Sequence, residues 1–406
     1  MPRELAELPK GVRVTDFISL GVLAEKFPLS KVQAVLQETG RESQRQRNLP
    51  AHVVVYYVIA LALYTGVSYG EVLRCLVEGL AWLGVDVRRL RRTAKSAISQ
   101  ARSRLGVEPL KRLYEEVVRP IALRRTKGAW YRDWRLMTLD GSTLELGDTR
   151  ENAAEFGRPG ASRGRSAFPQ LRFVSLVENG THVLLGAEAG SYATAENTLG
   201  RTVLGRLTPG MLCLADRNFF SYPLWKSAAA TGADLLWRVK KNLLLPCLKR
   251  FPDGSYLSPI YPSAKARRHQ REAILVRVIE YRLEGVQGSE PLYRLMTTIT
   301  DAEKAPARQL AALYHERWEI ENALDELKTH LRGARTVLRS KKPDLVRQEF
   351  YGFLLAHFAI RGLMHEAALR ADVDPDELCF VHSVRVLRRK LPAFVSIPPS
   401  AQNGLS

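Results

Sequence analysis

The chain of 406 residues is long enough for two to three domains of about 150 residues each, and its hydrophobic share of 46% excludes a purely disordered or fibrous protein. Lysine and arginine number 61 against 42 aspartates and glutamates, which gives a formal net charge of +19 at pH 7. A positive field of this size concentrates polyanions, and nucleic acid is the commonest of them. An anionic membrane surface, or simple solubility, would explain the same charge.

The cysteines and the most apolar segment point to a reducing compartment and away from a membrane. The four cysteines are widely spaced, so neither a CxxC metal pair nor a dense disulfide framework can form. The apolar run over 53–64 is shorter than the roughly 20 residues that cross a bilayer and is typical of a buried helix. The first residues lack the apolar core of a signal peptide. We therefore expect a cytoplasmic protein without a membrane partner.

Residues 1–128 are expected to be all-helical. Pro50 suits the first position of a helix that continues through the apolar run. Residues 68–83 repeat apolar side chains at helical spacing.

A basic cluster lies within this helical region. Residues 87–107 hold seven basic side chains and no acidic one. A solvated helix face is one interpretation. In so basic a chain, a helix-turn-helix contact with DNA is favoured, with residues 96–106 (SAISQARSRLG) as the recognition helix. The basic residues are Arg88, Arg89, Arg91, Arg92, Lys95, Arg102 and Arg104, and the candidate base readers are Ser99, Gln100 and Arg102.

From Trp130 the pattern changes to strands separated by helices. Three strands, a helix, a strand, a helix and a strand predict a mixed α/β sheet. Turn signals and strand-like runs then predict a β-rich inserted subdomain, and two long helical patterns follow over 306–330 and 343–368. The expected organisation is a helical N-terminal domain over 1–128, an α/β core over 129–239 and 301–370, the insertion over 240–300, and a tail over 371–406.

Two aspartates follow apolar strands in the same manner. Asp140 comes directly after the run RLMTL, and Asp216 directly after MLCLA. A carboxylate at the end of a buried strand is held rigidly while facing solvent, which suits a metal ligand. Aspartate also commonly begins a turn after a strand, and for either residue alone this structural interpretation is the more frequent one. The pair is more informative, because both strands can be neighbours in one sheet.

A third acidic residue lies in a helical segment nearer the C-terminus. Four polar residues of this segment are spaced so that, at about 100° per residue, they share one stripe beside an apolar face. The helix can therefore dock on the sheet and leave the stripe at the margin of the core. An ordinary surface pair between Arg317 and Glu321 is the alternative. The stripe consists of Tyr314, Arg317, Glu321 and Lys328.

Three acidic residues at the margin of one sheet, in a strongly basic protein, fit two-metal phosphoryl transfer. Carboxylates bind the hard cations Mg²⁺ or Mn²⁺, and two such ions activate an attacking oxygen and stabilise the leaving one. A glycosidase also uses paired carboxylates across a cleft, but the basic excess argues against it.

The motifs resemble those of a known family, the DDE transposases of bacterial insertion sequences, in the group named for insertion element four. The spacing Tyr314-x2-Arg317-x3-Glu321-x6-Lys328 matches the signature of that group at every position. The segments LDGSTLELGDT around Asp140, NAAEFGRPG at 152–160 and LADRNFF around Asp216 add to the likeness, which spans roughly residues 10–370 and includes the helical N-terminal region.

The resemblance implies an RNase H-like core in which Asp140, Asp216 and Glu321 hold two divalent ions, Mg²⁺ or Mn²⁺. In the family's chemistry, water first frees a 3′-hydroxyl at the transposon end, and that hydroxyl then attacks target DNA. Tyr314, Arg317 and Lys328 match positions that contact DNA near the cleaved end. Trp318 offers a face on which an unpaired base can stack, with a core aromatic as the equal alternative. Weaker candidates for DNA contact are Trp237 and the cluster Lys265, Arg267, Arg268 and Arg271.

The resulting hypothesis is a transposase that binds the terminal inverted repeats of its element, cleaves at their ends and joins them to target DNA in the bacterial cytosol, close to the nucleoid. A homodimer is expected, because two ends must be brought together. A domesticated DNA-binding protein with the same fold and a general RNase H-like nuclease are the alternatives. The intact acidic triad disfavours the first, and a preference for element ends would distinguish the second.

Overall fold

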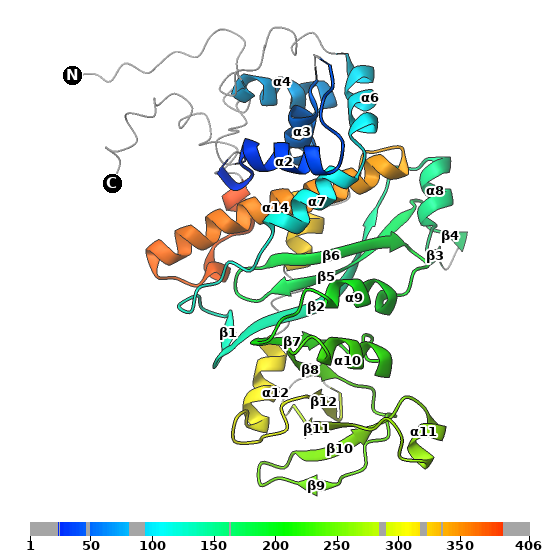
Figure 1. Cartoon of the computed structure of the whole chain (residues 1–406), viewed down its shortest axis with the longest axis vertical. Coiled ribbons are helices and arrows are strands. Elements are labelled where there is room, and N and C mark those ends of the chain that lie inside the picture. The colour runs from blue at the N-terminus through cyan, green and yellow to red at the C-terminus, as the bar shows by residue number, and fades with distance from the viewer. Residues whose placement is uncertain are drawn as a thin grey trace, which may run out of the picture. The chain divides into compact units, whose positions relative to one another are not determined.

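A computed structural model of the chain describes residues 23, 25–45, 49–80, 94–161, 164–283, 290–316, 323–333 and 336–384 (Figure 1). The chain divides into two compact units. Unit 1 contains Met1–Val118, Glu326–Ala367 and Glu377–Ser406, and unit 2 contains Arg119–Asp325 and Ala368–Asp376.

Unit 1 is helical in its described parts and is built around a helix that is buried on all sides. Every residue from Val53 to Leu63 is buried, because this segment is apolar on every face. The sequence predicted Pro50 as the first helical residue, whereas the structure has Pro50 as the N-cap and Ala51 as the first residue of the helix. The helices are α2 (Leu29–Glu38), α3 (Ala51–Leu63), α4 (Tyr69–Leu80), α6 (Lys95–Leu105), α7 (Glu108–Val117), the π-helix η3 (Glu326–Leu331) and α14 (Pro343–Ala371), whose last turn passes into unit 2.

A glycine allows the closest helix packing in unit 1. A Cβ atom on Gly352 of α14 would lie 2.7 Å from the backbone oxygen of Val58 in α3, so only glycine lets the two backbones approach this closely. The long C-terminal helix is therefore part of the same core as the N-terminal helices.

Unit 2 is a mixed sheet, as expected from the alternation of strands and helices. Ten of the described strands form one sheet in the order β6-β5-β2-β7-β8-β12-β11-β10-β9, with β1 paired to β2. Its strands are β1 (Trp130–Tyr131), β2 (Trp134–Glu145), β5 (Gln170–Glu178), β6 (Val183–Ser191), β7 (Met211–Ala215), β8 (Asp234–Arg238), β9 (Lys249–Arg250), β10 (Tyr256–Ile260), β11 (Ile274–Tyr281) and β12 (Tyr293–Thr297).

The strands expected to form a separate insertion continue this sheet. β12 pairs with β8, and β11, β10 and β9 follow it outward in antiparallel order. The remaining elements of unit 2 are the hairpin β3 (Gly160–Ala161) and β4 (Gly164–Arg165), the helices α8 (Arg150–Phe156), α9 (Glu196–Leu204), α10 (Tyr222–Ala229), α11 (Ala264–Arg268) and α12 (Ala307–Glu316), and the 3₁₀ turn η4 (Pro375–Glu377).

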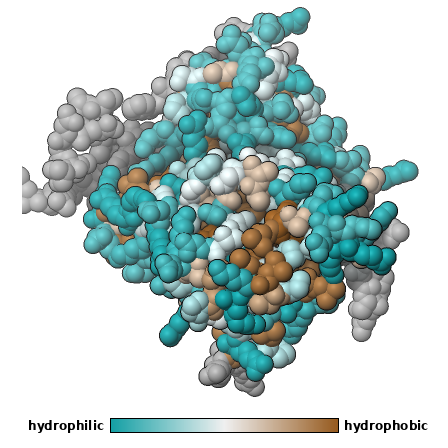
Figure 2. Space-filling view, turned by 60° about the horizontal axis from the view of Figure 1, so that its bottom comes forward, coloured by the Kyte–Doolittle hydropathy of each residue, from teal (hydrophilic) through white to brown (hydrophobic). Residues whose placement is uncertain are grey.

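Alternating side chains divide the buried surface of the sheet into two cores. On β2, Leu139 packs with residues of α9 and α10, whereas Leu136 packs with residues of α12. On β7, Cys213 belongs to the first core and Leu214 to the second. Helices therefore cover both faces of the central strands. Figure 2 shows a largely hydrophilic surface with one hydrophobic patch on the visible side.

The segment expected to be one long helix over 306–330 is not uniform. The α-helix α12 occupies Ala307–Glu316, and a π-helix occupies Glu326–Leu331. A π-helix has a wider turn than an α-helix, so the spacing rule that placed Lys328 on a stripe with Tyr314 does not hold across this segment. No helix in the described parts of the chain is long and apolar enough to cross a membrane.

Candidate active site and DNA-contacting residues

Two carboxylates lie on one row at the edge of two central strands. β2 and β7 run parallel, and Leu139 is the register partner of Ala215. Asp140 is the next residue of β2, Asp216 directly follows β7, and both side chains are partly exposed. The expectation that the two strands are neighbours is confirmed, and the two aspartates stand at the same level.

Local hydrogen bonds orient both carboxylates. The backbone N–H of Gly141 donates to Oδ1 of Asp140 at 2.8 Å. The backbone N–H of Asn218 donates to Oδ1 of Asp216 at 2.7 Å, and its side-chain amide donates to Oδ2 at 3.2 Å. Asp216 therefore also begins a turn, which is the structural role that the sequence analysis gave as the alternative. Turn formation and metal binding are compatible, because a carboxylate oxygen has two lone pairs.

The face of the sheet on which Asp140 lies is the one that α12 covers. Leu136 and Asp140 have the same parity on β2, and Leu136 packs with Leu310 and Leu313 of α12. The segment that contains Glu321 follows α12 in the sequence. The sequence predicted that a helix docks on the sheet. In the structure, α12 packs on this face.

Tyr314 belongs to the core and to the strand end next to Asp216. Its side chain is buried, with 5% of its surface exposed, and its hydroxyl donates to the backbone oxygen of Ala215 at 3.3 Å. This corrects the expectation that Tyr314 faces DNA, because a buried ring with a bonded hydroxyl offers no DNA-facing surface. Arg317, Trp318 and Glu321 lie outside the described residues.

A buried ion network fixes the start of α12. Arg277 of β11 has no exposed surface and donates to Asp253 at 2.7 Å, to Ser255 at 2.8 Å and to two backbone oxygens before α12. Asp253 also accepts the backbone N–H of Ala307, the first residue of α12, at 2.9 Å. Burial alone would raise the pKa of Asp253, but hydrogen bonds from Ser255 and Ala307 and the charge of Arg277 outweigh it and lower that pKa. The outer strands and α12 are therefore held as one piece.

The sequence did not single out the acidic residue of the π-helix. Glu326 is buried, accepts Nε of Arg361 at 2.8 Å and a second bond from the same guanidinium, and lies 3.1 Å from Nε2 of His357. An acidic residue flanked by Leu324 and Leu327 on the apolar side of the helix was the available signal. Lys328, in the same π-helix, is partly exposed.

The helix α6 has an exposed polar face, but Arg102, which was expected on that face, is buried. Lys95, Ser99, Gln100 and Arg104 are exposed. Arg102 is buried and donates to Gln348 at 3.3 Å, to Ser340 at 3.1 Å and to the backbone oxygen of Leu345 at 2.8 Å. The prediction that Arg102 reads base edges is therefore wrong, because its guanidinium is occupied inside unit 1. Arg88, Arg91 and Arg92 lie outside the described residues.

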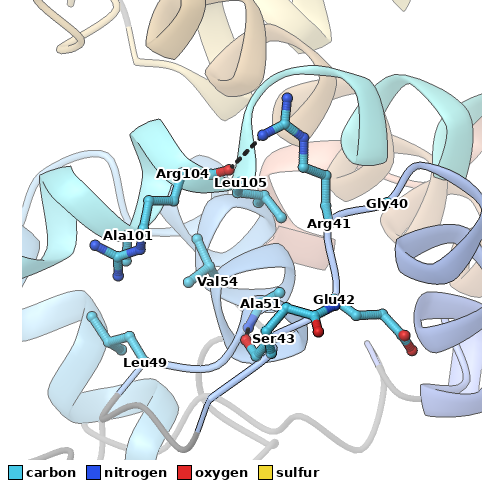
Figure 3. A pocket seen from close by; sticks show the side chains of 11 residues that line it. Gly40, Arg41, Glu42, Ser43, Leu49, Ala51, Val54, Ala101, Arg104 and Leu105 are labelled. Atoms are coloured by element: carbon cyan, nitrogen blue, oxygen red, sulfur yellow. Dashed lines mark hydrogen bonds between the residues drawn. The ribbon is translucent and has the colours of Figure 1, made fainter.

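Arg104 borders a hollow of about 290 Å³ between α6, the start of α3 and the loop after α2 (Figure 3). Arg41 lines the same hollow and donates to the backbone oxygen of Arg104 at 3.2 Å. Ser43 accepts the backbone N–H of Ala51 at 2.9 Å and so holds the loop against α3. Two arginines thus line one depression of unit 1.

The weaker candidates for DNA contact in unit 2 also include one buried residue and several exposed ones. Trp237 is fully buried, with its ring centroid 5.2 Å from that of Trp225, so the expectation that it touches DNA is wrong. The basic residues around α11 lie on the surface: Lys265, Arg268 and Arg271 are exposed, and Arg267 is partly exposed.

Comparisons with known proteins identify the family of the chain. The family model for the N-terminal region of insertion element 4 transposases matches residues 17–115, and the model for the transposase DDE domain matches residues 133–359. Over 371 residues the chain is 28% identical to the transposase InsG for insertion sequence element IS4 of Escherichia coli (strain K12), covering 91% of this chain and 82% of that protein. Over 233 residues it is 27% identical to the putative transposase InsZ of the same strain, covering 57% of this chain and 73% of that protein.

Among solved structures, the piggyBac transposase in its synaptic complex with hairpin DNA matches with a TM-score of 0.44 and 10% identity, over 95% of this chain and 81% of that chain. The matched DDE domain defines a metal-dependent, DNA-cleaving transposase with an α/β RNase H-like core. The chain belongs to the insertion-element-four family of DDE transposases. The expectations of family, fold class and transposase activity are confirmed, and DNA is its partner.

Proposed function

We propose that Asp140, Asp216 and Glu321 are the metal-binding residues of this transposase, and that they hold two Mg²⁺ or Mn²⁺ ions. The observation that carries the proposal is the register of β2 and β7, which places Asp140 and Asp216 on one row. Their oxygen donors suit a hard divalent cation. Within the described ranges, no three His, Cys, Asp or Glu side chains gather as a metal site, and the third proposed ligand lies in the undescribed segment 317–322.

The protein's own groups orient the reaction. Bound divalent ions supply Lewis acidity and an activated oxygen nucleophile at the scissile phosphate. The N–H groups of Gly141 and Asn218 orient the carboxylates of Asp140 and Asp216. Tyr314 acts as a positioning residue, because it holds the strand end from which Asp216 projects.

We further propose that the exposed basic residues bind the phosphates of the element's terminal inverted repeats, and that two copies of the chain join two ends in a synaptic homodimer in the cytosol. The positive excess of the chain supports phosphate binding. On α6, Ser99 and Gln100 are exposed and are the proposed base readers, whereas Lys95 and Arg104 contact phosphates. Arg317 and Lys328 are proposed to contact phosphates near the cleaved end.

The decisive experiment compares cleavage and binding on a duplex that carries the terminal repeat, which is read from the DNA flanking the gene. Alanine at Asp140, Asp216 or Glu321 should abolish Mg²⁺-dependent cleavage and leave binding intact, because a metal ligand is lost and no positive charge is removed. Asp133→Ala is the matched control, since Asp133 is an exposed carboxylate of unit 2 paired with Arg124. Cleavage by Asp216→Ala would overturn the assignment, and equal cleavage of a scrambled duplex would indicate a general nuclease.

A further inference from the structure

A glutamate is held by three basic residues beside the row of aspartates. Glu290 accepts Arg217 at 2.8 Å and Arg238 at 2.6 Å through Oε1, and its Oε2 lies 3.4 Å from the ammonium of Lys241. The three cations come from the turn after Asp216, the end of β8 and the loop that follows it. This group of four residues is called the Glu290 cluster below.

The cluster lies on the same row as the two aspartates. β7 and β8 are parallel, and Ala215 is the register partner of Trp237 just as Leu139 is of Ala215. The next residues on the three neighbouring strands are therefore Asp140, Asp216 and Arg238. Because Arg238 has the parity of Leu236, which packs with α12, it lies on the face of the sheet that Asp140 shares.

Aromatic side chains also hold Arg238 in place. Its guanidinium carbon lies 4.7 Å from the ring centroid of Tyr293, and that ring stacks on Tyr281 at 5.3 Å. His315 of α12 packs edge-on against both tyrosines, at 5.5 and 5.6 Å. Burial and the charge of Arg238 lower the pKa of His315, so the ring of His315 adds no competing positive charge at neutral pH. Arg238 is thus a fixed cation on an aromatic support.

The cluster has more positive than negative charge and is open to solvent. Three cations face one carboxylate, and the side chains of Arg217 and Lys241 are 46% and 48% exposed. Hydrogen bonding from Arg238 is the main cause that lowers the pKa of Glu290, so this side chain is an anion at neutral pH. Guanidinium groups bind carboxylate and phosphate oxygens with the same geometry. A carboxylate therefore occupies a site that would accept a phosphate.

We propose that Arg217, Arg238 and Lys241 bind a backbone phosphate of the DNA strand that enters the active site, and that Glu290 is the counter-ion that occupies their site until DNA displaces it. The proposal rests on the proposed function of Asp140 and Asp216, because it places the phosphate beside their row. Displacement is feasible because Glu290 is itself 29% exposed, and because the three cations exchange one anionic partner for another. The site reads no base, since phosphate contacts are alike in every sequence.

The test measures the affinity of the full chain for a terminal-repeat duplex and for a scrambled duplex, without divalent metal and at several salt concentrations. Glu290→Gln should tighten binding to both by roughly threefold to tenfold, because the competing anion is gone. The matched control is Glu280→Gln, since Glu280 is equally exposed and paired with Arg294 on the same sheet. If Glu290→Gln binds no more tightly than Glu280→Gln, the counter-ion role is refuted.

Two further variants keep the test decisive if Glu290→Gln folds poorly. Arg217→Gln and Lys241→Gln change exposed side chains, and each should weaken binding and reduce the magnitude of the salt slope by about one. The gain from Glu290→Gln should disappear when Arg238→Gln is added, which a general charge effect would not produce. Unchanged affinity in both single variants would overturn the phosphate site. The readout is independent of cleavage and of end preference, so failure of the proposed function leaves this result interpretable.

Discussion

The hydroxyl of Tyr314 donates to the backbone oxygen of Ala215, the residue directly before Asp216. One hydrogen bond of 3.3 Å thus joins α12 to the strand end that carries a proposed metal ligand. The signature tyrosine is therefore placed to act on the site through the protein backbone. This relation leads to the first prediction.

Replacing Tyr314 with Phe should reduce cleavage while DNA affinity stays unchanged. The ring remains in the core, but the bond to the β7 strand end is lost, at a cost of about 1 kcal/mol in the free energy of unfolding. Tyr131→Phe is the matched control, because Tyr131 donates to Gln309 on the same helix at 2.8 Å, away from Asp216. Denaturant unfolding, end binding and cleavage are measured for both. A loss of DNA affinity in Tyr314→Phe alone would restore the tyrosine to a DNA contact.

The two arginines of α6 should have different effects. Arg102→Ala leaves Gln348 and Ser340 with lost partners inside unit 1 and should lower the free energy of unfolding by about 2–4 kcal/mol. Arg104→Ala removes an exposed side chain and should weaken DNA binding with a stability change within about 0.5 kcal/mol. Thermal unfolding and anisotropy titrations separate the effects. A stable Arg102→Ala protein that has lost only sequence preference would contradict the burial argument.

The lowered pKa of Asp253 predicts how the free energy of unfolding changes at acid pH. Its folded pKa is lowered, so its contribution to stability is complete above the unfolded value of about 4 and is lost as pH falls through the folded pKa. Asp253→Asn should cost about 1–3 kcal/mol at pH 7, because the buried guanidinium of Arg277 then lacks its anionic partner. The difference from the original protein should shrink below about pH 4. Urea unfolding from pH 7 to pH 2.5 measures it, and a pH-independent difference would argue against the ion pair.

Two glycines of α14 provide a matched pair. Gly352→Ala would place a methyl group 2.7 Å from the backbone oxygen of Val58, and the resulting shift should cost about 1–3 kcal/mol. Gly362→Ala meets only the flexible side chain of Lys26 at 3.4 Å and should stabilise the helix by up to about 1 kcal/mol. Melting temperatures of the two variants should move in opposite directions. Equal shifts would show that the approach of α14 to α3 is not close.

The strand and helix order of unit 2 could be predicted because local patterns determine it. Asp140 and Asp216 were found because each follows a buried apolar run, which is a purely local signal. Their row could not be predicted, since the register of β2 against β7 depends on residues far apart in the sequence. The same limit applies to β12, whose pairing with β8 turns the expected subdomain into part of the main sheet.

Some residues that the sequence patterns assigned to the DNA-contacting surface are buried in the structure. Arg102 belongs to a basic run, but its partners Gln348 and Ser340 stand more than 200 residues away, so no local pattern shows that it is buried. The boundary expected near residue 128 falls at Val118 in the compact units, and the N-terminal helices share their unit with Glu326–Ala367. A fragment of residues 1–128 lacks α14, and thus the helix that packs on α3.

The continuity of the sheet has a mechanical consequence. The outer strands β9–β12 and the aspartate-bearing β2 belong to one ladder of backbone hydrogen bonds, and β8 joins them directly. A force on the outer strands is therefore transmitted through the hydrogen bonds between neighbouring strands. A displacement of the outer strands would then move Asp140 and Asp216 together.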